Sequence, residues 1–506
     1  MRAAGSALAL LAAGALAGAA HAQPPPPSAA QCAAVRAHRS LPPVLALDPR
    51  PGAPRVFAMQ YKQQVADVVS YAAFRTKIEC LIREDVVPYL APGRPNVVAF
   101  DEDVGLATIA TGTRGAAARA VAGQTPLGPL SCESQGVPCG TLAALGAVSA
   151  GYAPQLAYYR ARFPQLSPLS GVFVAATDTF VRGFMETFSE LARRYGVYIL
   201  GSNDQAPFRV SHDPVDIAAL ADPDLPRPSS VYVATSDSVY NEVFLWGPHD
   251  VRRQGPGPLR NLLAGNRKVP LTPLEQELQF TPGPSTGPAA AANLEPYRLP
   301  GTDARLGFAT SLPAFVYGAP PPGVDPCSDT SRYYMRCLGE LGANVVIQDE
   351  ANPGRWTGAD GDGIEQWQPL SWMSSAWRAV TDPSVSFLYA VNPMMVGNLA
   401  DLAFDGQSAI LQRGLTGAGC HYVGDGAWVP GEDRPDLLAD AGAKPQFLAL
   451  APWVRPDGPR ADLRAVGTKL APGSRDPLED DYLETALVAD LPVPVDAARP
   501  GCVTAP

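Results

Sequence analysis

The stretch NRKVPLTPLE at residues 266–275 holds residue types with clear chemical potential. It contains Lys268, one of only five lysines among 39 lysine and arginine residues. In a chain that otherwise uses arginine, a retained lysine indicates a need for a compact ammonium rather than a planar guanidinium. Glu275 closes the stretch with a carboxylate. From composition alone, a surface lysine in a loop is the simpler interpretation.

A second ionisable group, Asp101-Glu102-Asp103, directly follows the apolar run NVVAF at 96–100. A glutamate at a strand end can take and return a proton, and an ammonium can stabilise negative charge that develops on a substrate. A solvated turn after a strand is the alternative interpretation of the acidic cluster.

The other motifs favour no different chemistry. The chain has no G-x-S-x-G motif, and SHD at 211–213 is typical of a polar loop or a helix cap before Pro214. GADGDG at 358–363 resembles half a calcium loop, but it lacks the downstream glutamate, which favours a glycine-rich turn. We therefore expect no metal and no cofactor.

Alternating strands and helices must position these residues. Helical spacing of apolar residues predicts helices at 70–89, 178–194, 331–342 and 370–381. Continuous apolar runs predict strands at 55–60, 96–100, 197–202, 230–235, 241–247, 305–310, 344–352, 386–392 and 406–411. Strands without polar alternation favour an α/β fold whose sheets are covered by helices. Residues 23–54 are predicted to be a poorly ordered Pro-rich leader, and 415–506 to be irregular.

The N-terminus and the charge balance limit compartment and partners. Arg2, an apolar run and Ala20-His21-Ala22 predict a cleaved signal peptide at 1–22, and hence a secreted or periplasmic protein. The formal net charge is −10 and no basic run occurs, which argues against nucleic acid as a partner. No other apolar run reaches the length of about 18 residues that would suggest a membrane span.

The eight cysteines favour disulfides, because their number is even and the chain is expected to be exported. Local spacing suggests the pairs Cys132–Cys139 and Cys327–Cys337, and it leaves the other four open. Metal binding is the weaker interpretation, because the spacings are wide.

Several segments, in this order, resemble the nitrilase, or carbon–nitrogen hydrolase, superfamily. They are FAMQ, VVAFDE, ELARRYGVYILGS, Tyr240-Asn241, NRKVPLTPLE, LGANVVIQDEAN, WRAV and FDGQSAILQRG. The resemblance implies an α-β-β-α sandwich over residues 55–415, with insertions at about 104–170 and 313–330, followed by a C-terminal extension at 416–506. It also implies covalent catalysis, in which an acid–base group and an ammonium converge on one nucleophile. On that match Glu102 is the general base, Lys268 is the catalytic lysine and Glu275 is a positioning glutamate. Family members commonly pair, so the resemblance also allows a homodimer.

The expected nucleophile departs from the family. The family's cysteine should end the strand RLGFAT, and Ser311 stands in that position, followed by Leu312 and Pro313. A serine hydroxyl is harder to ionise than a thiol and needs a strong adjacent base. That base is Glu102, or Lys268 if the lysine is neutral. Cys327 and Cys337 lie too far along the chain and are better explained as a disulfide.

Two hypotheses follow from the resemblance. The first is a hydrolase, of the amidase or nitrilase type, that acts on non-peptide C–N bonds of small amide-like substrates. The second is a nitrilase-fold binding or scaffold protein that has lost its activity with its cysteine. A buried Glu–Lys–Glu cluster can persist without catalysis, because breaking it is costly.

Overall fold

The computed structural model describes residues 24–36, 40–122, 139–351, 368–399, 402–417, 445–451 and 484–503. The expected signal peptide, the motif at 358–363 and Cys132 lie outside these ranges. The predicted Cys327–Cys337 disulfide is confirmed, and a second disulfide joins Cys32 to Cys80.

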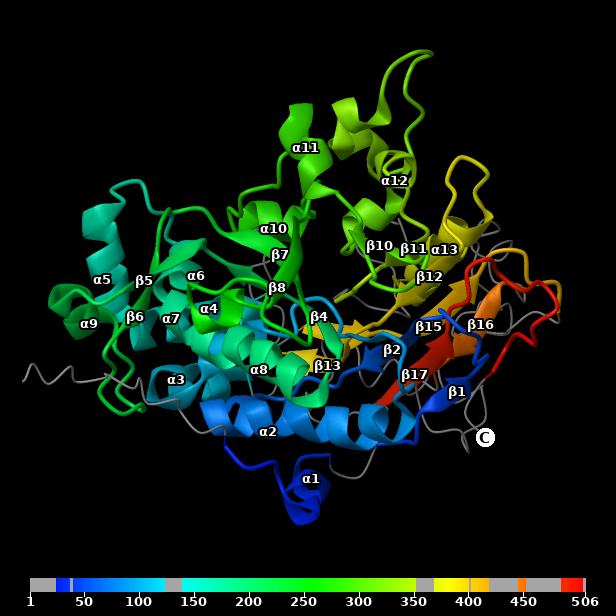
Figure 1. The fold of residues 1–506 in the computed structure, drawn as a ribbon. Helices are drawn as coiled ribbons and strands as arrows, with labels where there is room; N and C mark the ends of the chain where they lie inside the picture. Colours follow the sequence, from blue (N-terminus) through cyan, green and yellow to red (C-terminus); the bar gives the residue numbers. More distant parts are fainter. Residues whose placement is uncertain are drawn as a thin grey trace, which may run out of the picture.

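Two mixed sheets form the centre of the molecule (Figure 1). The first has the strand order β1-β17-β2-β3-β4-β7-β8 and the second β16-β15-β12-β11-β10-β9. The strands of the first sheet are β1 Val44–Ala46, β2 Arg55–Gln60, β3 Asn96–Ala99, β4 Tyr198–Gln205, β7 Tyr240–Trp246, β8 Leu262–Arg267 and β17 Thr485–Asp490. Those of the second are β9 Tyr297–Arg298, β10 Arg305–Phe308, β11 Val345–Ile347, β12 Tyr389–Asn392, β15 Ala409–Gln412 and β16 Phe447–Leu450.

The helices and minor strands surround these sheets. The α-helices are α1 Ala29–Arg36, α2 Tyr71–Leu81, α3 Gly112–Ala122, α4 Cys139–Gly151, α5 Ala153–Arg162, α6 Gly171–Ala175, α7 Thr177–Phe180, α8 Glu186–Tyr195, α9 Pro214–Leu220, α10 Pro273–Glu277, α11 Gly287–Asn293, α12 Thr330–Glu340 and α13 Gln368–Thr381. Two short hairpins pair β5 Phe208–Ser211 with β6 Val231–Ala234, and β13 Val396–Leu399 with β14 Leu402–Asp405.

The molecule has four layers, in the order helices, first sheet, second sheet, helices. The side chains of each strand alternate between the other sheet and the helices. In β3, Val97 and Ala99 face the second sheet, whereas Val98 packs against α2 and α8. In β11, Val345 and Ile347 face the first sheet, whereas Val346 packs against α12 and α13. Because both faces of each sheet are buried, the central residues of β3 and β11 are continuously apolar. The expected α-β-β-α sandwich is therefore confirmed, and Figure 1 shows α2 and α12 on opposite sides of the two sheets.

Both chain ends differ from the sequence prediction. The leader is not poorly ordered at residues 44–46, because β1 lies at the edge of the first sheet and pairs in parallel with β17. The C-terminal region is not irregular at 485–490, because β17 lies between β1 and β2, where Figure 1 shows it in red. β16 extends the second sheet in the same way. Both segments after residue 415 thus belong to the sandwich itself.

Buried charges join the two chain ends. Glu484, just before β17, forms an ion pair with Lys77 of α2 at 2.6 Å. Arg36 of α1 lies 3.5 Å from the same carboxylate. Arg36 also pairs with Asp85 at 2.8 Å. These charges are nearly fully buried and mutually paired, so losing one partner would leave another uncompensated.

The expected insertion at about 104–170 is mainly helical where it is described, and its residues 163–170 form turns. Tyr152, Leu156 and Tyr159 of this region enter a hydrophobic cluster with Leu271 and Leu278, which flank α10. The insertion therefore shares a hydrophobic cluster with the residues that flank α10, the short helix that carries Glu275.

Candidate functional site

The candidate residues follow strands of the two central sheets. β3, β4 and β8 run in the same direction, since β4 pairs in parallel with β3 and is connected to β8 through antiparallel β7. Glu102 follows β3 and Lys268 follows β8, so both emerge at the carboxyl edge of the first sheet. Ser311 follows β10 and Asp349 follows β11, two parallel strands of the second sheet. Carboxyl edges of this kind are where α/β folds commonly build their sites.

Lys268 lies between the two predicted glutamates. Its Nζ is 2.8 Å from Glu102 Oε1 and 2.9 Å from Glu275 Oε1. The Lys268 side chain is 2% exposed. The structure therefore brings Glu102, Lys268 and Glu275 into one buried cluster.

Asn241 bridges the same two carboxylates. Its Nδ2 donates to Glu102 Oε1 at 2.8 Å and to Glu275 Oε1 at 2.9 Å. The backbone of Asn241 also accepts from the Lys268 N–H. Asn241 thus binds both carboxylates through its side chain and the Lys268 backbone through its carbonyl oxygen.

Glu275 is fixed by its own helix terminus. Thr272 is the N-cap of α10, and its backbone N–H and hydroxyl both donate to Glu275 Oε2 at 2.7 Å. The TPLE sequence is thus a capping box, a signal that is readable without the structure. Because one oxygen serves the cap and the other serves Lys268 and Asn241, Glu275 is suited to positioning rather than to proton transfer.

The electrostatics fix the charge on Lys268. Burial alone would lower the pKa of its ammonium, but the Glu102 and Glu275 carboxylates outweigh burial and raise it above its ordinary value. Burial raises the pKa of Glu102, and Lys268 opposes that rise. The raised pKa favours the charged form of Lys268 and argues against a neutral lysine as a base.

Ser311 lies in a strained turn. Its backbone has φ 58° and ψ −125°, a conformation that residues with a side chain rarely adopt. It precedes a short 3₁₀ helix, Leu312–Phe315, and its side chain does not cap that helix. Its backbone N–H donates to Asp349 O at 3.2 Å. A sharp turn of this kind at a strand end can present a hydroxyl away from its own backbone.

Residues 349–351 connect Ser311 to Glu102. The Ala351 N–H donates to Glu102 Oε2 at 2.9 Å. Thr310 Oγ1 donates to Asp349 Oδ1 at 2.8 Å. Ser311 and Glu102 therefore both bind the same short segment after β11, one through Asp349 and the other through Ala351.

The buried carboxyl of Asp349 is expected to make the stability of the protein depend on pH. Burial, and then the charge on Glu102, raise the pKa of Asp349 to about 7. Because this pKa is above that of an unfolded aspartate, the contribution of Asp349 to stability is present at low pH and is lost as pH rises through about 7. In urea unfolding, Asp349→Asn should lose less stability than the wild type between pH 5 and pH 8. Equal losses in the two proteins would contradict the assignment.

The competing interpretations of the sequence fare differently. Cys327 and Cys337 form a disulfide, so neither is the nucleophile. Asp213 caps α9 by accepting from the Val215 N–H, as expected for SHD. Asn241 entered the sequence analysis only through the resemblance, and Asp349 was not singled out at all. The available signal for Asp349 was an acidic residue two positions after the apolar run Val345–Ile347.

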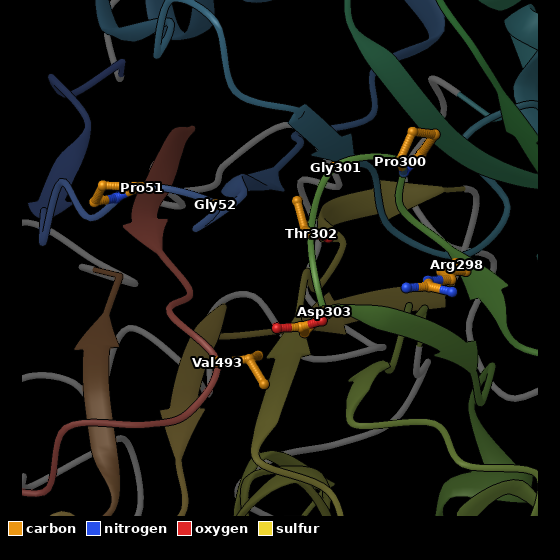
Figure 2. Close-up of a pocket in the computed structure, with 8 residues that line it drawn as sticks. All are labelled: Pro51, Gly52, Arg298, Pro300, Gly301, Thr302, Asp303 and Val493. Atoms are coloured by element: carbon orange, nitrogen blue, oxygen red, sulfur yellow. The ribbon is translucent and has the colours of Figure 1, made fainter.

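A pocket of about 440 Å³ lies at another part of the surface. Figure 2 shows Arg298 and Asp303 on one side of it and Pro51 on the other. None of the candidate residues lines it. Within the described ranges, no three histidine, cysteine or carboxylate residues are placed to hold a metal ion. No described helix has the length and apolar character needed to cross a membrane.

Comparisons with known proteins return only distant structural similarity. No family model and no curated protein matches the chain. An amidase from Nesterenkonia sp. AN1 with acrylamide on its active-site cysteine is 12% identical, with 71% of this chain and 85% of that chain covered and a TM-score of 0.31. A carbon-nitrogen hydrolase from Helicobacter pylori G27 is 12% identical, with 71% and 81% covered and a TM-score of 0.36. Similarity at this level does not decide the chemistry of this chain, so the roles of its residues rest on the geometry given above.

Proposed function

We propose that this protein is an amidase-type hydrolase that acts on non-peptide C–N bonds of small amides through Ser311. The observation that carries the proposal is the strained turn at Ser311. The backbone of this turn binds Asp349, and Ala351 of the same segment after β11 binds Glu102. Lys268 supplies a buried ammonium beside Glu102. A candidate nucleophile, base and cation thus come from three separate strand ends.

The proposed reaction proceeds by acyl transfer. Glu102 takes the proton of the Ser311 hydroxyl as its oxygen bonds to the amide carbon, and the carbonyl oxygen becomes an oxyanion near the Lys268 ammonium. Glu102 then gives the proton to the leaving nitrogen, the C–N bond breaks, and an amine or ammonia departs. A water molecule, deprotonated by Glu102, attacks the acyl ester and releases the acid, and Ser311 regains its proton.

The environment of Glu102 suits a demanding base. Burial raises its pKa, so its conjugate acid is weaker and the carboxylate accepts protons more readily. Lys268 stays an ammonium and therefore remains available for the oxyanion. Serine still requires more from the base than a thiol would, so we expect a slow enzyme.

A binding or scaffold function is the second candidate, and one observation favours it. Both oxygens of Glu102 already accept hydrogen bonds, Oε1 from Lys268 and Asn241 and Oε2 from Ala351. A base that is so fully engaged must give up a partner to take a proton. The Glu–Lys–Glu cluster would then serve only the fold.

Turnover of amides separates the two functions. The purified, oxidised protein should release ammonia from small aliphatic amides, and Glu102→Gln should lower the rate about 10²–10⁴-fold. Glu242→Gln is a matched control, because Glu242 pairs with Arg267 at 3.3 Å and neighbours Asn241 on the opposite face of β7. A wild type without turnover, or a Glu102→Gln variant as active as Glu242→Gln, would favour the binding function.

We also propose that the protein works in an oxidising compartment. The Cys32–Cys80 and Cys327–Cys337 disulfides support this location, since such bonds persist mainly outside the cytosol.

A further inference from the structure

One buried acceptor in the site lacks a donor. The Asn241 amide can take only one orientation, because turning it over would place Oδ1 against the Glu102 and Glu275 carboxylates that Nδ2 now binds. In that orientation, Oδ1 is buried and has no hydrogen-bond partner among the described residues. A buried acceptor without a donor is costly, so a donor is expected next to it.

Asp204 is placed to be that donor. It lies directly opposite Asn241 in the antiparallel pairing of β4 with β7, so the two side chains project from the same face. Asp204 is only 4% exposed, and its Oδ1 is also buried without a partner in the described part of the chain. An ionised aspartate only accepts hydrogen bonds, whereas a protonated one also donates. A single hydrogen shared between two facing acceptors would satisfy both.

We infer that Asp204 is held in its protonated form and donates its proton to Asn241 Oδ1, which makes Asp204 a positioning residue for Glu102 and Glu275. The donated bond fixes the Asn241 amide plane, and that plane sets where the two carboxylates lie relative to Lys268. The consequence for catalysis rests on the proposed function, but the protonation state of Asp204 does not.

The surrounding charges support a neutral Asp204. Burial raises its pKa well above the ordinary value, and the carboxylates of Glu275 and Glu102 raise it further, whereas Lys268 opposes them. Asp103, on the loop after β3, has its own pKa raised by burial and by Asp204, so the two acids disfavour ionisation of each other. One ammonium faces several carboxyl groups here, and a neutral Asp204 reduces that excess of negative charge.

Infrared difference spectroscopy tests the protonation state directly. The spectrum of the wild type minus that of Asp204→Asn, recorded at pH 8, should contain the carbonyl band of a protonated carboxylic acid. Asp250→Asn is the control, because Asp250 is a surface carboxylate with 36% side-chain exposure, and its difference spectrum should lack the band. A carboxylate band in place of the acid band for Asp204 would overturn the inference.

Matched variants test the donated bond. An asparagine amide at position 204 can donate to Asn241 as a neutral acid does, so Asp204→Asn should keep the melting temperature of the wild type. Asp204→Ala removes the donor and should lower it by roughly 2–4 °C. If Asp204→Asn were as damaging as Asp204→Ala, the side chain would be needed as an anion and the inference would fail.

A thiol reporter tests the positioning role. In a Ser311→Cys background, the rate of alkylation by iodoacetamide across pH reports the base beside position 311. Adding Asp204→Asn should leave that pH profile unchanged, and adding Asp204→Ala should shift its midpoint to higher pH and lower the rate below the midpoint about tenfold, a loss typical of a displaced supporting residue. Equal profiles for all three proteins would reject the positioning role. An acid band in the infrared with no alkylation at position 311 would instead count against the proposed function.

Discussion

Replacing Lys268 by alanine is expected to destabilise the protein by about 3–5 kcal/mol, because it leaves buried carboxylates without their cation. Lys268 Nζ is bound to Glu102 and Glu275 at 2.8 and 2.9 Å, and its side chain is 2% exposed. Urea unfolding followed by circular dichroism measures the loss.

An exposed basic residue serves as the control for the effect of burial. Arg332 is a basic residue with 74% side-chain exposure, paired with Asp329 at 3.7 Å. Arg332→Ala should change stability by no more than about 0.5 kcal/mol, as exposed substitutions usually do. If Lys268→Ala cost as little as Arg332→Ala, the cluster would not be the tightly paired, dry arrangement described here.

Replacing Ser311 by alanine is expected to lower amide turnover by about 10⁴–10⁶-fold, because the members of a covalent catalytic unit fail together when the nucleophile is lost. The variant should still fold, since alanine fits the space of serine. Ser311→Cys should keep or raise the rate of acylation, because a thiol is the better nucleophile. Initial rates of ammonia release measure both changes.

A distant hydroxyl provides the control for this series. Ser328→Ala removes a surface hydroxyl that donates to the nearby Asp325 carbonyl, and it should leave turnover unchanged. If Ser311→Ala retained the rate of Ser328→Ala, another group would be the nucleophile and the assignment of the site would be wrong.

The sequence was informative where the signal is local. The apolar runs at 96–100 and 305–310 predicted strands, and β3 and β10 lie there. The rarity of lysine marked Lys268 and the resemblance marked Glu275, and in the structure Lys268 pairs with both Glu102 and Glu275. Their catalytic roles stay predictions.

The sequence was less informative where pairing is remote. β17 pairs with β1 and β2, which lie near the other end of the chain. A short run such as TALVAD contains no local signal that predicts those partners. Asp204 and Asn241 are similar, because their opposition depends on the register of β4 with β7. Burial and pairing of this kind arise only once the sheet has formed.

The most direct test of the account is the identity of the residue that becomes acylated. The oxidised protein is treated with a serine-reactive fluorophosphonate, digested and mapped by mass spectrometry. We predict a single adduct on Ser311, absent from Ser311→Ala and slowed about 10²–10⁴-fold in Glu102→Gln, as loss of a general base requires. An adduct on another residue, or an unmodified Ser311 in the wild type, would contradict a serine nucleophile served by Glu102 and Lys268.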